Sequence, residues 1–455
     1  MFADQMLELF AKESPVSVMV RATLEHALGD DRLNAIFEEQ AERQYCRELT
    51  FAGCVALMTL VVARIRPSIH AAYQARAEDF AVTVQSVYNK LQGIEPAVTE
   101  ALVRETAADF RKVIDELDGA VDGPLAGFDV RIIDGNHLAG TEHRIQELRR
   151  LGAAALPGQS VPVLDPQRQL IEDVVLCEDG HAHERVLLDQ LLKKVAAGQC
   201  WIADRAYSTK LFLFGIADRK AYFVIRQHAS LTGELLGQRR KIGHTETGVV
   251  YEQEIKITYE AGATKTFRRV TIERDQRTRK GETAVHILTN LPQRVTALRV
   301  AAAYRSRWTI ESAFQEVTVH LRCELNTLGY PDAALFGFGI ALLIHNALSV
   351  IQAALRGSQT NRRKIERNLS LYALADEVSG VWRGLEIAVP QAIWTKNFAR
   401  LTTKQLAGQL RLLARKVDLK KFTTYKWSPK TKQPKRQSGN RGNHVATQRL
   451  LAKRT

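Results

Sequence analysis

The chain has 455 residues, of which 45% are hydrophobic and 25% charged, and this composition predicts a globular protein with about two to four domains. The net charge is +14, but residues 420–455 hold 11 Lys and Arg and no Asp or Glu. The other 419 residues therefore carry only +3, which excludes a uniformly basic surface. The five cysteines form no CxxC pair and no long apolar run opens the sequence, so we expect a reducing, cytoplasmic location.

Residues 1–120 are predicted to be helical, with a break at Pro67. Short helices in succession are typical of a small DNA-binding domain. In the segment "TVQSVYNKLQG" (83–93), Ser86, Asn89 and Lys90 lie three and four residues apart and share one helical face. We predict that this face meets phosphates or base edges as a recognition helix; the alternative is the solvated face of an ordinary helical domain.

Five strands are predicted between residues 121 and 227. The first, in "GFDVRIIDGNHL", ends at Asp134, and the fourth, in "CWIADRAYS", ends at Asp204. The second and third are Val161–Leu164 and Leu170–Leu176, "ERVLLDQLLKKVAAG" (184–198) is a helix, and "KAYFVIRQ" is the fifth strand after a short connection. If the first and fourth strands are neighbours, both aspartates reach one sheet edge, which is the ribonuclease H-like arrangement.

The second half of the chain alternates between strand and helix signals. Residues 228–290 show the alternation of an antiparallel β insertion with clustered positive charge, and helical sequence runs without Gly or Pro from residue 293 to 328. Ala333–Leu355 carries no formal charge but contains polar residues, which favours a buried core helix over a membrane span. The basic tail lacks apolar periodicity and predicts a disordered segment attracted to a polyanion, or else a solubilising tail.

The segment "YRSRWTIESAFQE" (304–316) places three polar side chains along one margin of a predicted helix. Tyr304, Arg307 and Glu311 fall within an arc of about 60°, beside an apolar stripe. Taken alone, Arg307 and Glu311 make an ordinary i, i+4 ion pair. If Glu311 converges with Asp134 and Asp204, the three carboxylates would instead repel one another and need cations, and oxygen-only ligation suits two Mg²⁺ or Mn²⁺ ions.

This segment resembles the Y-x2-R-x3-E-x6-K signature of bacterial insertion-sequence transposases of the insertion sequence four family. "IIDGNHL" and "WIADRAYS" are similar to the two aspartate boxes of that family, and "TNLP" (289–292) is also typical. The resemblance implies a ribonuclease H-like catalytic core in which Asp134, Asp204 and Glu311 bind the metals and catalyse. It also implies that Tyr304 and Arg307 contact the transposon end and that Arg226 contacts a phosphate.

Two features depart from that family. The signature lysine falls at Thr318, which carries no charge, although His320 or Arg322 lie close by in the sequence. In relatives that open DNA through a hairpin, an aromatic residue of the insertion stacks on a flipped base; this insertion has no Trp, which leaves Tyr251, Tyr259 or Phe267.

The resemblance therefore predicts a DNA transposase that binds terminal inverted repeats, cleaves the ends with two metal ions and joins them to target DNA. Its partners would be double-stranded DNA and a second copy in a synaptic homodimer, within the bacterial nucleoid and without a membrane. The alternatives are a non-catalytic DNA-binding protein derived from a transposase and a ribonuclease H-like nuclease without strand transfer. We expect a helical DNA-binding domain at 1–120, a catalytic core at 121–227 and 291–375, a β insertion at 228–290, C-terminal helices at 376–419 and a basic tail at 420–455.

Overall fold

A computed structural model describes seven stretches of the chain, and these are 2–44, 48–138, 156–259, 262–276, 281–325, 328–358 and 369–423. They belong to one compact unit that ends at Thr423. The predicted basic tail after this residue lies outside the described residues.

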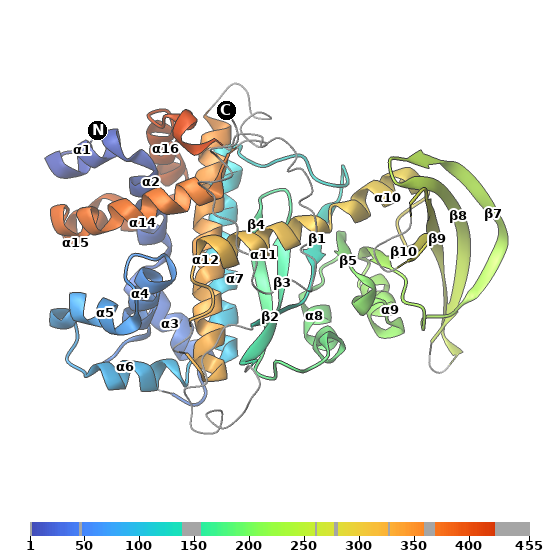
Figure 1. Cartoon of the computed structure of the whole chain (residues 1–455), viewed down its shortest axis with the longest axis horizontal. Helices are drawn as coiled ribbons and strands as arrows, with labels where there is room; N and C mark the ends of the chain where they lie inside the picture. The colour runs from blue at the N-terminus through green and yellow to red at the C-terminus, as the bar shows by residue number, and fades with distance from the viewer. Residues whose placement is uncertain are drawn as a thin grey trace, which may run out of the picture. The chain divides into compact units, whose positions relative to one another are not determined.

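Helices from both ends of the chain pack together around the long helix α12 (Pro331–Gly357) (Figure 1). The N-terminal ones are α1 (Gln5–Glu13), α2 (Pro15–Ala27), α3 (Asp30–Gln40), α4 (Phe51–Val62), α5 (Ile69–Ala75), α6 (Val84–Leu91) and α7 (Pro96–Leu117). The C-terminal ones are α14 (Leu371–Ala388), α15 (Gln391–Trp394) and α16 (Thr403–Ala414). Their apolar faces share one core, so the N-terminal helices do not bury a separate core of their own.

Side-chain caps set where several of these helices begin. The hydroxyl of Thr50 accepts a hydrogen bond from the Gly53 amide at the start of α4, and Thr402 forms a reciprocal capping box with Gln405 at the start of α16. Each such cap satisfies an amide that the helix leaves unpaired. The helical prediction for residues 1–120 is confirmed, and the caps explain where some of these helices begin.

Helix α12 is the core helix that the sequence predicts. Among the described residues it is the one helix that is long and apolar enough to cross a membrane, yet its apolar window lies entirely inside the protein. Two of its buried polar residues bond to the backbone of residues 169 and 171. The Asn346 side chain accepts a hydrogen bond from the Ile171 amide and donates one to the Ile171 carbonyl, both at 2.8 Å. Ser349 donates to the carbonyl of Gln169 at 2.7 Å.

The strands form one mixed sheet in the order β2-β3-β1-β5-β6-β10-β9-β8-β7, with β4 on the outer side of β3. The strands of the core are β1 (Asp129–Ile133), β2 (Asn136–Leu138), β3 (Gly158–Asp165), β4 (Leu170–Cys177), β5 (Gln199–Ala203) and β6 (Tyr222–Arg226). β1, β5 and β6 run parallel, whereas β3 is antiparallel to both β1 and β4. The predicted mixed sheet is confirmed, and the short β2 is an addition to the prediction.

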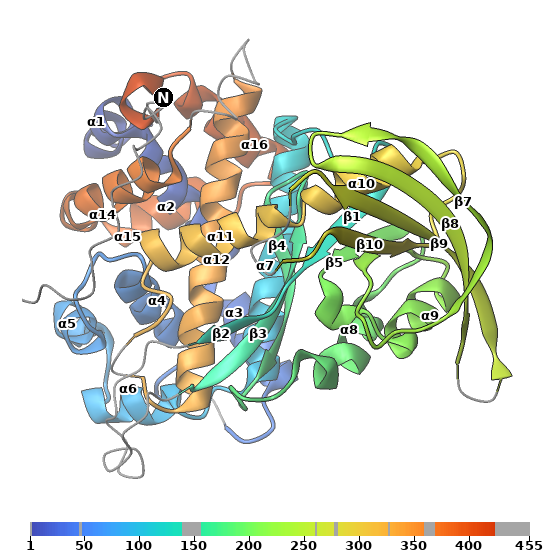
Figure 2. The same ribbon diagram turned by 45° about the vertical axis from the view of Figure 1, so that its right-hand side comes forward.

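Helices cover both faces of the core sheet (Figure 2). Val130 and Ile132 of β1 belong to the core shared with α7 and α12, whereas Ile133 belongs to a second core with α8 (Leu188–Lys194) and α9 (Lys210–Asp218). Strands buried on both faces read as continuous apolar runs, which is why these segments are rich in Val and Ile. The connection between β5 and β6 contains α9 and is therefore not the short link that the sequence analysis expected.

The predicted β insertion is confirmed and extends the core sheet. Its strands are β7 (Glu234–Thr245), β8 (Gly248–Thr258), β9 (Thr264–Arg274) and β10 (Ala284–Thr289). β10 pairs with β6, and the remaining strands follow in antiparallel order. One arginine of the expected basic cluster is structural: Arg268 is 6% exposed, pairs with Glu252 and donates to the carbonyls of Leu291 and Val295.

The helical stretch after residue 293 consists of two helices, α10 (Ala297–Arg305) and α11 (Trp308–His320), which run from the insertion toward the helical layer (Figure 1). The single continuous helix through 304–316 is a wrong prediction. At the junction the Arg307 amide bonds to the Tyr304 carbonyl and the Ile310 amide bonds to the Arg307 carbonyl, a tighter three-residue spacing. The Thr309 hydroxyl also donates to the Ser306 carbonyl at 2.6 Å, which competes with the regular helical bonds.

Candidate active site

Asp134 and Asp204 directly follow the carboxyl ends of two neighbouring parallel strands. Asp134 follows β1 and Asp204 follows β5, and Ile132 is aligned with Ile202 in the register of that pair. Both carboxylates therefore leave the sheet at the same edge, as the sequence analysis expected. In open α/β sheets this edge is where ligands usually bind.

The junction between α10 and α11 brings two further side chains onto this edge. The Tyr304 hydroxyl donates to Asp204 Oδ1 at 3.2 Å. Arg307 lies between two acids, with Nη1 at 2.7 Å from Asp134 Oδ2 and Nη2 at 2.7 Å from Glu311 Oε1. These contacts form two groups, Tyr304 with Asp204 and Arg307 with Asp134 and Glu311, and the charge of Asp204 also acts on Asp134.

Burial and neighbouring charges perturb the ionisation of Asp134. Burial raises its pKa to about 6, the neighbouring Arg307 guanidinium opposes that rise, and Glu184 and Asp204 add to it. Arg307 is only 7% exposed and its Nε has no acceptor among the described residues. A buried guanidinium between two carboxylates supplies the positive charge that such a cluster needs.

Glu184 is a fourth carboxylate that the sequence analysis missed. It lies in the turn Glu184–Leu187 before α8, and its Oε1 would be 2.2 Å from a Cβ placed on Gly135, the neighbour of Asp134. Its Oε2 and the hydroxyl of Tyr207 are both buried, and burial raises the pKa of Glu184 while the neighbouring Tyr207 hydroxyl lowers it. The sequence does show this acid in "HAHERVLL" after the third core strand, but the helical pattern of the segment gives no reason to single it out.

Arg226 ends β6 beside the same edge, and its Nη2 lies 2.7 Å from both carboxylate oxygens of Glu282. Asp204 and Tyr304 both raise the pKa of this arginine, after the larger and opposite effect of burial. Arg226 is therefore near Asp204 and Tyr304 but already has an acidic partner from the insertion, and its contact with a phosphate stays a prediction.

The predicted recognition face lies elsewhere, on α6. Asn89 is exposed and accepts from Gln85, Ser86 is bonded to Thr83, and the Lys90 ammonium lies 4.0 Å from the centre of the Phe37 ring. The structure brings none of these three residues to the acidic edge. Their role in DNA binding stays a prediction.

Thr318, which replaces the signature lysine, and the three aromatic candidates of the insertion all contact neighbouring residues. Thr318 is exposed, and its hydroxyl donates to the Phe314 carbonyl at 2.7 Å. Among the aromatic candidates, Phe267 is 3% exposed and packs in the second core, Tyr259 packs against Phe214, and Tyr251 is covered by Arg239 at 3.7 Å. Phe267 is thus unsuitable for stacking on a base.

The donor chemistry of this edge fits a hard divalent cation, because all its acids offer carboxylate oxygen. Within the stretches described, however, no three Asp, Glu, His or Cys side chains are grouped closely enough to hold one metal ion. Arg307 occupies the position between Asp134 and Glu311 that a cation would take. The guanidinium is the countercharge of this arrangement.

Comparison with known proteins places the acidic edge within a segment similar to a known family. Residues 127–347 match the family model described as "Transposase DDE domain". The match covers just under half of the chain, and this segment is similar to transposase DDE domains. All three acids and Tyr304, Arg307 and Arg226 fall within that match, and the N-terminal helices fall outside it.

One curated relative is the "Putative transposase y4zB" of Sinorhizobium fredii, which is 30% identical over 165 residues. The alignment covers 35% of this chain and 44% of the relative, so the chain spans less than half of that protein's length. Among solved structures, a chain of the cryo-EM structure of the piggyBac transposase synaptic complex with hairpin DNA aligns with a TM-score of 0.39 and 12% identity. That alignment covers 83% of this chain and 84% of the other.

Proposed function

We propose that the protein is a DNA transposase whose catalytic acids are Asp134, Asp204 and Glu311. The observation that carries this proposal is that Asp134 and Asp204 leave one sheet edge side by side while Arg307 ties Glu311 to Asp134, inside the segment that matches the DDE domain. The substrates are the terminal inverted repeats of an insertion sequence and a target duplex, and the reaction is cleavage followed by joining of the 3′-hydroxyl ends.

The order of the core sheet supports a ribonuclease H-like core for this activity. β4, β3, β1, β5 and β6 lie side by side, β3 is antiparallel, and the last three are parallel. That order puts the ends of β1 and β5 next to each other, and α10 and α11 carry the third acid across them. The resemblance to the insertion sequence four family belongs to the same proposal.

Two Mg²⁺ or Mn²⁺ ions, when bound, would activate the attacking hydroxyl and stabilise the leaving oxygen of a phosphodiester. Asp134, Asp204 and Glu311 would hold them. Arg307 must first release at least one of its two carboxylates, and the freed guanidinium then has the geometry to grip a phosphate with two parallel bonds. Tyr304 orients Asp204 through its hydroxyl. Arg226 can bind a phosphate once its ion pair with Glu282 is broken.

DNA recognition and assembly complete the proposal. The N-terminal helices, with Ser86, Asn89 and Lys90 exposed or half-buried on α6, would contact the duplex outside the catalytic edge. Two ends must be held together for strand transfer, so a homodimer in the synaptic complex is expected. Bacterial cytoplasm with nucleoid association is the corresponding location.

The test is cleavage and strand transfer of a labelled element end by purified protein with Mg²⁺. Asp134→Asn, Asp204→Asn and Glu311→Gln each remove a metal ligand and should lower both products by at least about 100-fold, the scale typical of losing a transition-state contact. Asp189→Asn is the matched control, since Asp189 is exposed on α8. Full activity in any of the three variants would remove that acid from the proposed site.

A second candidate is a DNA-binding protein that no longer cuts. The observation that favours it is the Arg307 guanidinium between Asp134 and Glu311, because it neutralises the acids without a metal. A gel shift without any metal-dependent nick would support this candidate, and released ends that never join would support a nuclease without strand transfer.

A further inference from the structure

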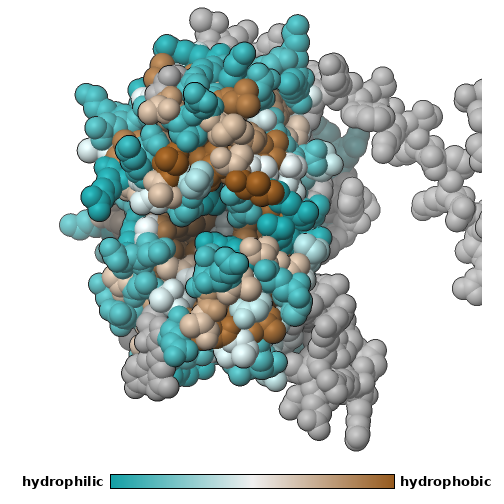
Figure 3. Space-filling model, turned by 90° about the vertical axis from the view of Figure 1, so that its left-hand side faces the viewer, coloured by the Kyte–Doolittle hydropathy of each residue, from teal (hydrophilic) through white to brown (hydrophobic). Residues whose placement is uncertain are grey.

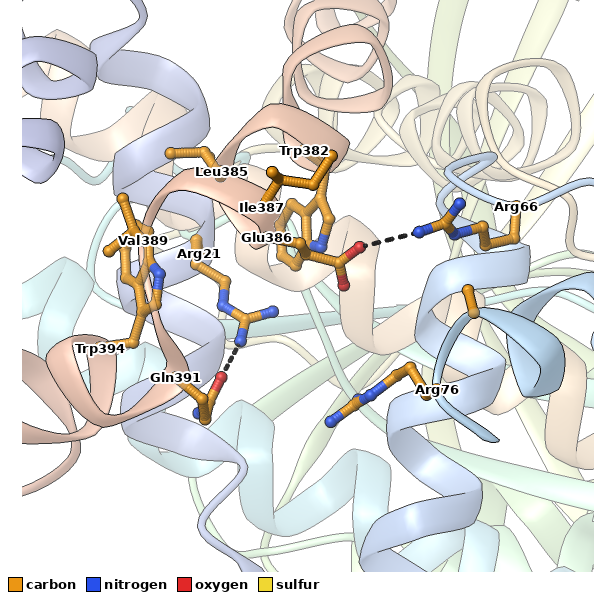
Figure 4. A pocket seen from close by; sticks show the side chains of 11 residues that line it. Arg21, Arg66, Arg76, Trp382, Leu385, Glu386, Ile387, Val389, Gln391 and Trp394 are labelled. Carbon is orange, nitrogen blue, oxygen red and sulfur yellow. Dashed lines mark hydrogen bonds and ion pairs between the residues drawn. The ribbon is translucent and has the colours of Figure 1, made fainter. Parts of the chain in front are cut away.

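A cavity of about 250 Å³ opens within the helical layer, away from the acidic edge. It lies among α2, α14, α15 and the segment around α5, and its polar lining consists mainly of Arg21, Arg66, Arg76, Trp382, Glu386 and Trp394 (Figure 4). Figure 3 shows the face that carries α1, α5 and α15, where a hollow with hydrophobic side chains is bordered by hydrophilic ones. The sequence analysis assigned Trp382 and Trp394 to packing only.

Arg21 is held between the two indole rings. Its guanidinium carbon lies 5.0 Å from the ring centre of Trp382 and 5.7 Å from that of Trp394. Its Nη2 donates to Gln391 (Figure 4). Nη2 also lies 3.7 Å from Oε2 of Glu25. Stacking on aromatic faces fixes a guanidinium while leaving the N–H groups at its edge available to a ligand.

Three buried nitrogen atoms around this cavity have no acceptor among the residues that the structure describes. They are Arg21 Nε, Arg66 Nε and Trp382 Nε1. All three are obligate hydrogen-bond donors, and Trp382 is only 2% exposed. Leaving such groups unpaired is costly. All three are shielded from solvent, so an acceptor oxygen in the cavity would reach them only after a side-chain shift.

The positive charge around the cavity comes from three arginines, each of which also has an acidic neighbour. Its lining has three arginines and one acid, Glu386, which lies 3.4 Å from Arg66. Burial lowers the pKa of Arg21, Glu25 and Glu386 oppose this, and the positive charge of Arg76 lowers it further. Arg76 itself pairs with Asp79 at 2.8 Å. An anion between Arg21 and Arg76 would relieve the repulsion between them.

We propose that this cavity is a phosphate-binding site, built by Arg21, Arg66, Arg76 and Trp382. Its volume is below the range of pockets for drug-sized ligands, so a phosphate group fits it better than a complete cofactor. Tetrahedral oxygens can accept from several N–H groups at once, and bonds to charged groups are the strong ones. The group is either a phosphodiester of bound DNA or a free phosphate. The site does not depend on the proposed catalysis at Asp134.

The experiment titrates inorganic phosphate into the full chain at low salt, with calorimetry and tryptophan fluorescence as readouts. Arg66→Gln removes one charged donor and should weaken phosphate binding by roughly tenfold or more, the effect of losing about 1.4 kcal/mol or more. Trp382→Phe keeps a ring and removes only the N–H, and should weaken it by a few-fold. Arg400→Gln, an exposed arginine in the same C-terminal region, should leave it unchanged.

A second arm identifies the source of the phosphate. A mixed-sequence duplex replaces inorganic phosphate, and its affinity is measured over a range of salt concentrations. If the site takes a DNA phosphodiester, Arg66→Gln weakens the duplex complex and lowers the salt slope by about 1. If it takes free phosphate, the duplex affinity is unchanged and duplex does not displace phosphate.

Equal affinities of the wild type, Arg66→Gln and Trp382→Phe proteins for both ligands would overturn the phosphate site. Thermal unfolding of each variant verifies that it is folded. Should Trp382→Phe unfold, Arg66→Gln decides, because Arg66 is partly exposed and sits outside the aromatic stack.

Discussion

Arg307 determines the arrangement of the acids in the candidate active site. Its two terminal nitrogens lie at 2.7 Å from Asp134 and from Glu311, and its side chain is almost completely buried. A buried ion pair is costly to desolvate, and removing one partner leaves an uncompensated charge. Replacing Arg307 alone would therefore disturb the fold as well as any chemistry, and it is a poor first test of function.

The raised pKa of Asp134 gives a pH prediction at the same scale. A protonated carboxyl does not bind a divalent cation, so Mn²⁺ affinity should fall as the pH drops through about 6. Glu184→Gln removes a repelling charge and should move this midpoint to lower pH. Binding followed by electron paramagnetic resonance measures it, with Asp189→Asn as the control. A midpoint that does not move would show that Glu184 is electrostatically separate from Asp134.

The same shift has a consequence for the metal-free protein. The folded pKa of Asp134 is raised from 3.8 to about 6, so the folded state binds the proton more tightly than the unfolded state. Its contribution to stability is fully present below pH 3.8 and is lost as the pH rises through about 6. A bound divalent cation would reverse this loss by pairing with the ionised form.

At the scale of the elements, the outer edge of β4 is closed by helix side chains. Asn346 of α12 satisfies both backbone groups of Ile171, and Glu100 of α7 accepts from the Leu176 amide at 2.8 Å. A strand edge with unpaired backbone groups is a site for unwanted pairing. The two longest helices of the layer therefore protect the edge as well as covering the sheet.

Asn346→Leu should destabilise the protein by about 2 to 4 kcal/mol, because it leaves two buried backbone groups unpaired. Urea unfolding measures the change in the free energy of unfolding. Gln352→Leu on the same helix is the control, since Gln352 is half-buried. An equal loss in both variants would mean that the amide bonds of Asn346 contribute nothing specific.

Local sequence patterns predict the strands and helices far better than they predict how these elements pair and pack. The strands that carry Asp134 and Asp204 were recognisable because β-branched runs end in a turn with a carboxylate. The break at Ser306 and Arg307 was not, because the helical period continues through it and the hydroxyls of Ser306 and Thr309 act only on the local backbone. The pairing of β10 with β6 and the position of Glu184 depend on contacts that are distant in sequence, which no local period encodes.

On the scale of the whole molecule, charge is divided between a nearly balanced folded part and a basic end. Residues 424–455 contribute nine Lys and Arg and no acid. Each phosphate that they neutralise should add about 0.9 to the slope of binding against salt on a logarithmic scale.

Deleting residues 424–455 should weaken binding to a mixed-sequence duplex and flatten its salt dependence. Affinity measured by fluorescence anisotropy between low and physiological salt tests this, with a duplex that carries the element end as a comparison. The loss should be similar for both duplexes, because phosphate contacts carry no sequence information. A slope identical to that of the full chain would remove the tail from DNA binding.

The joint between α10 and α11 links distant parts of the chain to the acids. α10 packs on the strands of the insertion, whereas α11 packs on α12 and α14. Any change in the bend at Ser306 and Arg307 would swing Glu311 relative to Asp134 and Asp204. A ligand that binds the insertion and the helical layer at the same time would therefore change the angle between α10 and α11, and with it the distance from Glu311 to the two aspartates.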